Sequence, residues 1–177
     1  MKSPISENGA AITVLDQIFK QMDYEWPGVW DKLNEMVQDT SGQQLNAEFA
    51  KFSLILGATA LNLRATFDLF PKAQAERIFI QTMKLYEAQF KNPKQFYVIT
   101  AVIRKIMDVY NVAITSMSDP FEQVAFQVYH NLGIKIQGAK AGTADHGIVA
   151  YLSHLLMEFS GKWDKLRENF EVLEEVV

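Results

Sequence analysis

Hydrophobic residues recur every three to four positions along most of this chain, which is the spacing of amphipathic α-helices. The clearest stripe lies within residues 94–117 and consists of Phe96, Ile99, Ile103, Ile106, Tyr110, Ala113 and Met117. No run of strictly alternating apolar and polar residues is long enough to predict a β-strand. The pattern therefore predicts an all-α protein.

Polar residues and a proline separate the helices that are predicted in the N-terminal part of the chain. Residues 1–9 are polar and suggest a loose tail, and a first helix is predicted at about 10–24. Pro27 suits the first turn of a second helix that continues through Val37. We therefore expect two helices within an N-terminal extension, residues 10–40.

The rest of the chain, residues 45–177, predicts a helical core. A mostly apolar helix is expected at 45–69, and another follows Pro71. Asn92-Pro93 and Asp119-Pro120 each combine a capping side chain with a proline suited to a first turn. The last helix begins near residue 145, and Ser160-Gly161 is a break within it. In total we expect a single domain, residues 1–177, of about seven to eight helices.

Composition narrows the classes of function. The 177 residues suffice for one domain with a substantial core, and 49% of them are hydrophobic. A net charge of −4 with scattered basic residues argues against nucleic-acid binding. Without cysteine there is no disulfide, no thiolate metal site and no thioether-linked cofactor. We find neither a signal peptide nor an apolar run that could span a membrane, and we expect a cytoplasmic protein.

Residues 121–134 hold the most informative local pattern. A short helix ends in Tyr129-His130, and Phe126 lies four residues before His130 on the same helical face. The helix is apolar on two sides, as suits a helix between a cofactor and the rest of a fold. A neutral imidazole there can ligate haem iron. The alternative is a partly buried histidine that only forms a hydrogen bond.

These residues carry a resemblance to the globins. Phe126, His130, Gly133 and Ile134 resemble the F helix and the corner that follows it, and Ile148-Val149 with Leu155-Leu156 resemble the G helix. The resemblance covers about residues 45–177, with two additional helices in front. It implies a globin-like topology and a non-covalently bound haem with His130 as the proximal ligand of the iron. The pocket residues that it implies are Phe90, Tyr97, Val98, Val102, Phe126, Ile134 and Tyr151.

The sequence also departs from the common globin pattern. Gly133 follows His130 by three residues, whereas four is usual, and an ungapped match places Tyr129 in the proximal position. That version is similar to phycobiliproteins and to haem-free globin-like sensor domains. Bilins are normally tethered through cysteine, which this chain lacks. The predicted helix 94–117 also has no distal histidine, which leaves Tyr97 or Gln95 as donor. Tyr129 and His130 therefore remain alternatives for the proximal position.

Motifs for catalysis are absent. The segment Gly138–Gly142 contains two glycines and a lysine but not the spacing of a phosphate loop, and neither GxSxG nor HExxH occurs. We therefore do not expect an enzyme.

Two functions follow from the sequence. The first is haem binding for gas binding or sensing, with a diatomic gas as ligand. The second is a haem-free globin-like regulatory module that binds an apolar small molecule or a partner protein. The apolar residues of 10–37 must be covered, and because the core already has enough helices we expect a homodimer that uses them.

Overall fold

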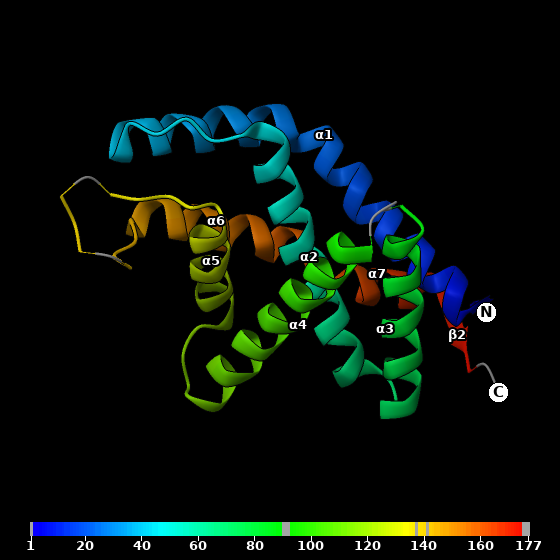
Figure 1. Cartoon of the computed structure of the whole chain (residues 1–177). Helices are drawn as coiled ribbons and strands as arrows, with labels where there is room; N and C mark the ends of the chain where they lie inside the picture. Colours follow the sequence, from blue (N-terminus) through cyan, green and yellow to red (C-terminus); the bar gives the residue numbers. More distant parts are fainter. Residues whose placement is uncertain (1, 90–92, 137, 141, 175–177) are drawn as a thin grey trace.

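The computed structural model describes residues 2–89, 93–136, 138–140 and 142–174. The chain is mostly helical, which confirms the all-α class. Its elements follow in the order β1 (Ser3–Ser6), α1 (Glu7–Ser41), α2 (Ala47–Leu69), α3 (Lys72–Glu87), α4 (Pro93–Thr115), α5 (Pro120–Asn131), α6 (His146–Phe159), α7 (Lys162–Asn169) and β2 (Phe170–Leu173). Figure 1 shows α1 along one side of the molecule and α2 passing through its middle.

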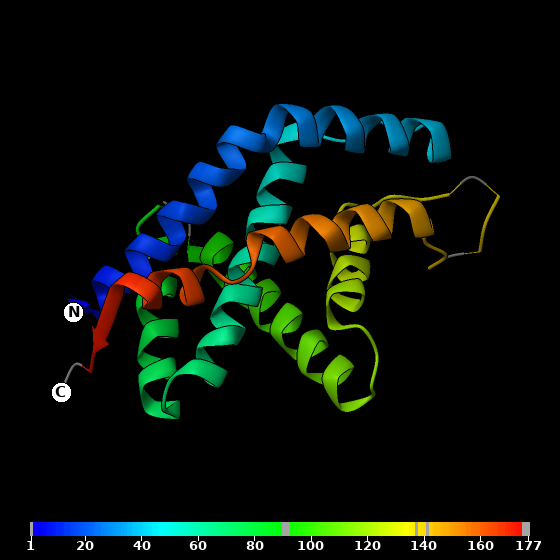
Figure 2. The ribbon, with the colours of Figure 1, turned by 180° about the vertical axis from the view of Figure 1, so that it is seen from behind.

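Helix α1 is one helix of 35 residues, not the two helices that Pro27 predicted. The Ser6 side chain caps its first turn by accepting a hydrogen bond from the amide of Gly9, and Gly42 ends it in the left-handed conformation at φ 65°. Pro27 lies inside the helix, where it removes one backbone donor but does not end it. Figure 2 shows that α1 bends along its length, so its two halves run past different parts of the molecule.

Helix α2 is central because the residues from Ser53 to Leu63 are buried on every side. Its Gly57 lets α5 and α6 approach closely, since an added Cβ would lie 2.8 Å from Leu156 Cδ2 and 3.3 Å from Val128 Cγ2. Asn62 joins α2 to the break between α6 and α7. Its Nδ2 donates to the carbonyl of Phe159, and its Oδ1 accepts from the backbone amide of Lys162, each at 2.9 Å. The predicted break at Ser160-Gly161 is confirmed.

The two ends of the described chain are joined by a parallel pair of strands. Residues 3–6, which we expected to belong to a loose tail, form β1 and pair with β2 in register from Ser3 with Phe170 to Ser6 with Leu173. Beside this pair, the guanidinium of Arg77 donates to the buried carboxylate of Glu7, from Nη2 to Oε1 and from Nε to Oε2, each at 2.9 Å. Its Nη2 also donates to Glu174 at 3.1 Å. These hydrogen bonds raise the pKa of Arg77.

Most apolar residues of α1 are covered by the same chain, whereas Ile12 is 45% exposed and Tyr24 is 87% exposed. Ile18, Met22, Leu33 and Val37 are buried in the common core, which α1 forms with α2, α3, α6 and α7. Helix α1 thus contributes to the common core. The homodimer that we expected from these residues stays a prediction. Within the described ranges, no helix is both long enough and apolar enough to cross a membrane.

Candidate functional site

The predicted proximal residues lie at the end of α5, and the helix turns them to different sides. Tyr129 is buried together with Val124, Ala125 and Val128, whereas His130 is exposed. The two rings meet edge to face with their centroids 5.7 Å apart. Burial raises the pKa of the Tyr129 phenol. The imidazole of His130 therefore points away from the core.

The other residues of the predicted haem pocket do not converge on His130. Tyr97 and Val98 are exposed on α4, and Ile134 is buried in the core. Val102, Phe126 and Tyr151 are half-buried, with the ring of Phe126 edge to face against His146 at 6.3 Å. Phe90 lies outside the described residues. Among the described residues, His130 is exposed and has no surrounding apolar pocket, which does not fit a haem iron site.

Val98 instead borders an open apolar groove between the start of α2 and the start of α4. The apolar side chains of this groove are Phe49, Phe52, Val98 and Ile99. It is a shallow surface feature, and His130 does not line it.

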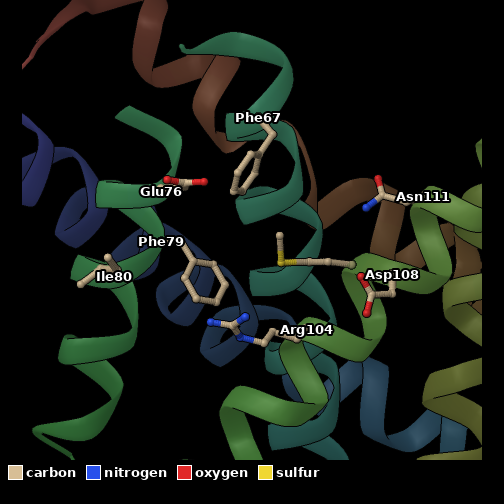
Figure 3. Close-up of a pocket in the computed structure, with 8 residues that line it drawn as sticks. Phe67, Glu76, Phe79, Ile80, Arg104, Asp108 and Asn111 are labelled. Carbon is tan, nitrogen blue, oxygen red and sulfur yellow. The ribbon is translucent and has the colours of Figure 1, made fainter. Parts of the chain in front are cut away.

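A deeper recess lies where α2, α3 and α4 meet, and Figure 3 shows the residues around it. Its volume is about 440 Å³, which is within the usual range for small-molecule sites. The recess exists because α3 and α4 both pack on α2 but touch each other much less. The gap between them opens to solvent over the side of α2.

Four apolar side chains form the walls of this recess. Phe67 comes from α2, Phe79 and Ile80 from α3, and Met107 from α4. Phe79 is nearly buried, whereas Ile80 is 51% exposed at the edge. Figure 3 shows Phe67 and Phe79 on the same side of the opening, one above the other. The walls thus offer aromatic and aliphatic surface to an apolar ligand.

Arg104 provides the positive charge of the recess. Its guanidinium lies over the ring of Phe79, 5.1 Å from the centroid, which is a cation–π geometry. Although Asp108 follows one turn later on α4, no carboxylate of the described residues lies within salt-bridge distance of Arg104. The guanidinium therefore packs on the face of the Phe79 ring, and its N–H groups form no salt bridge with a described carboxylate.

A second arginine, Arg64, is committed to the structure around the recess. It pairs with Asp68 at 2.8 Å, lies over the ring of Tyr110 at 5.8 Å, and donates from Nε to Oδ1 of Asn111. Because Nε can only donate, the atom of Asn111 that faces it must be the oxygen. The amide nitrogen of Asn111 is left as a donor on the side of the recess, as Figure 3 shows.

Two carboxylates complete the rim. Glu76 from α3 and Asp108 from α4 lie on opposite sides of the opening in Figure 3. Oε1 of Glu76 lies 3.8 Å from Nζ of Lys72. This ion pair is long and exposed, so it contributes little to stability. The rim and walls together carry one formal positive charge and two formal negative charges, and the positive one is nearest the apolar wall.

None of the eight residues around this recess was among the predicted site residues. Met107 and Arg104 lie beside the buried stripe of α4 and not on it, and nothing in the local sequence separates them from other residues at the margin of the stripe. The described residues also contain no group of three or more histidine and acidic side chains that could hold a metal ion.

No family model, curated protein or solved structure matches this chain. These comparisons neither support nor contradict the resemblance to globins.

Proposed function

We propose that this protein is a haem-free binding module that takes up a small apolar molecule in the recess between α2, α3 and α4. The observation that carries the proposal is the wall of Phe67, Phe79, Ile80 and Met107 around a volume of about 440 Å³. Burying a ligand against these side chains removes apolar surface from water on both partners, at roughly 25 cal/mol per Å². The globin-like topology stays a prediction, and the proposal does not depend on it.

The recess is formed by the fold itself and needs no rearrangement to be reached. Phe79 and Met107 are anchored on helices whose buried faces pack on α2, and Ile80 lies at the edge where a ligand would enter. A ligand in this place would bridge α3 and α4, which otherwise contact each other little. Occupancy of the recess would therefore stiffen the α3–α4 side of the molecule, as a regulatory module requires.

The proposal is tested with Nile red, a neutral dye that fluoresces strongly in apolar surroundings. Ile80→Glu places a charge at the edge of the recess, so we expect it to weaken binding of the dye by about tenfold or more. Ile12→Glu on α1 is the matched control, because Ile12 is 45% exposed against 51% for Ile80 and does not line the recess. Fluorescence titration of the three proteins measures the affinities.

The expected result is saturable binding to the native chain and to Ile12→Glu, and weak binding to Ile80→Glu. Absence of saturable binding, or equal loss in both variants, would overturn the proposal. Circular dichroism of each variant shows whether its helices are intact.

A further inference from the structure

We infer that the ligand of the recess is an apolar molecule with a single carboxylate, and that Arg104 binds this carboxylate. The inference rests on the proposed function and adds the chemical class of the ligand.

Arg104 has the features of an anion receptor. Its guanidinium is planar and permanently charged, and its N–H groups match the two oxygens of a carboxylate. The contact with the Phe79 ring, at 5.1 Å, covers one face of the guanidinium and leaves its N–H edge open. An arginine that is already oriented loses less conformational freedom when it binds an anion than one that is free in solvent.

The position of Arg104 also fixes how the ligand lies. The guanidinium is next to the aromatic wall, so a carboxylate bound to it places the apolar body of the ligand against Phe79, Phe67 and Met107. Arg64 does not compete for the carboxylate, because it is occupied by Asp68 and Asn111. One cation is therefore available for one anionic group.

The rim argues for a single negative charge on the ligand. Glu76 and Asp108 stand on opposite sides of the opening and repel a second anionic group near either side. A dicarboxylate or a phosphate dianion would meet this repulsion, whereas a monocarboxylate is neutralised by Arg104. A cationic ligand could approach the two acids, but the nearly buried Phe79 ring is already covered by a cation.

The experiment compares three ligands with the same ten-carbon chain and different heads, which are decanoate, decanol and decylamine. Each is titrated at neutral pH and low salt against the protein with Nile red bound, and displacement of the dye gives its affinity. Arg104→Gln removes the charge. Lys105→Gln is the matched control, because Lys105 is the adjacent exposed cation on α4 and does not line this recess.

We expect decanoate to bind about tenfold or more tightly than decanol or decylamine, and this preference to disappear in Arg104→Gln while Lys105→Gln keeps it. Because salt screens the attraction between Arg104 and the carboxylate, higher salt should reduce the difference in affinity between decanoate and decanol. Equal affinities for decanoate and decanol, or a preference that survives in Arg104→Gln, would overturn the inference. If Nile red still binds saturably in those outcomes, the proposed function remains and only the carboxylate specificity is wrong. If the dye does not bind saturably, both the proposed function and the carboxylate specificity are wrong.

Discussion

Gly57 lies where α2, α5 and α6 come closest, and its missing side chain sets their separation. The atoms nearest to an added Cβ are side-chain carbons of Leu156 and Val128, both in the buried core. Gly28, by contrast, lies in α1 with nothing within 4 Å of an added Cβ. The chain thus contains two helical glycines for which the same substitution should have opposite effects.

We expect Gly57→Ala to lower the free energy of unfolding by about 1–3 kcal/mol, because the packed Leu156 side chain must shift to accept the methyl group. Gly28→Ala should raise it by about 0.5–1 kcal/mol, since alanine loses less conformational freedom in a helix. Urea unfolding followed by circular dichroism measures both values. Stabilisation by Gly57→Ala would contradict the close approach of the three helices.

Lys162 is a buried cation without an acid. It is 4% exposed, its Nζ donates to Oε1 of Gln21, and the ammonium lies over the ring of Phe159 at 5.7 Å. No carboxylate of the described residues lies within salt-bridge distance of it. Burial lowers the pKa of Lys162, the nearby Lys165 lowers it further, and Glu25 opposes the change.

Because the folded pKa of Lys162 is below its ordinary value, the unfolded chain binds more protons between the two values, and stability rises with pH in that window. The penalty of the buried charge is complete below the folded pKa and is gone above about 10.5, the ordinary value. Lys162→Met lacks this rise. Its stability relative to the native chain should therefore fall as the pH approaches that value.

The measurement is urea unfolding of the native chain and of Lys162→Met at several alkaline pH values. Lys20→Met, which removes an exposed ammonium, is the control and should run parallel to the native chain. A constant difference between Lys162→Met and the native chain would mean that burial does not disfavour the charge.

At the scale of elements, two capping side chains were predicted, of which Asn92 lies outside the described residues and Asp119 is confirmed. Asp119 was predicted to cap the helix after Thr115, and its Oδ1 accepts hydrogen bonds from the backbone amides of Phe121 and Glu122 at 2.8 and 3.1 Å. Asp145 caps α6 in the same way through the amide of Ile148. A cap is recognised from three or four neighbouring residues, so the sequence contains all the information that it needs.

Asp119→Ala should lower the free energy of unfolding by about 1 kcal/mol, because two amides at the start of α5 lose their acceptor. Asp31→Ala serves as the control, since Asp31 is exposed within α1 and caps no helix; its effect should stay within about 0.5 kcal/mol. Thermal and urea unfolding of both variants give the comparison. Equal effects would show that the cap does not stabilise α5.

Other elements depend on contacts that no local pattern contains. Pro27 suits a first turn as well as an interior position, and packing on both sides of it continues α1 through the proline. Four-residue strands such as β1 are too short to show alternation, and β1 forms because β2 is brought beside it. The orientation of Tyr129 and His130 could not be read from spacing either, because both follow apolar residues at helical intervals.

The recess was missed for a related reason. Its residues come from three helices, and they lie at the margins of the buried stripes, where α3 and α4 diverge on α2. The stripe of α4 predicts which residues are buried, but the angle between α3 and α4 decides which neighbours are uncovered. The sequence of α4 alone therefore does not distinguish Arg104 from other exposed cations, because its contact with Phe79 comes from a different helix.

At the scale of the whole molecule, α1 belongs to the same core as the helices that follow it. It contributes buried residues at both ends, from Ala10 and Ile18 to Leu33 and Val37, and packs on α2, α3, α6 and α7. The sequence predicted residues 10–40 as an extension of the core at 45–177, and α1 packs on four helices of that core. The stability of the parts should therefore not be separable.

We expect deletion of residues 1–41 to abolish cooperative unfolding, because the faces of α2 and α3 that α1 covers would be exposed to water. The measurement is thermal unfolding together with size-exclusion chromatography, in which the shortened chain should aggregate or melt without a transition. A monomer that unfolds cooperatively would instead establish residues 45–177 as a domain of their own.

The pairing of β1 with β2 has a consequence for the synthesis of the chain. Residues 3–6 leave the ribosome long before residues 170–173, which complete the pair. At the usual 5–20 residues per second, the interval is roughly 10–30 s. During that time Arg77, which donates to Glu7, lacks its second acceptor Glu174, and the apolar face of α1 has no α7 to cover it. Strand β1 and the start of α1 thus reach their final contacts only after residues 162–174 are made, and until then their apolar side chains are a target for chaperones.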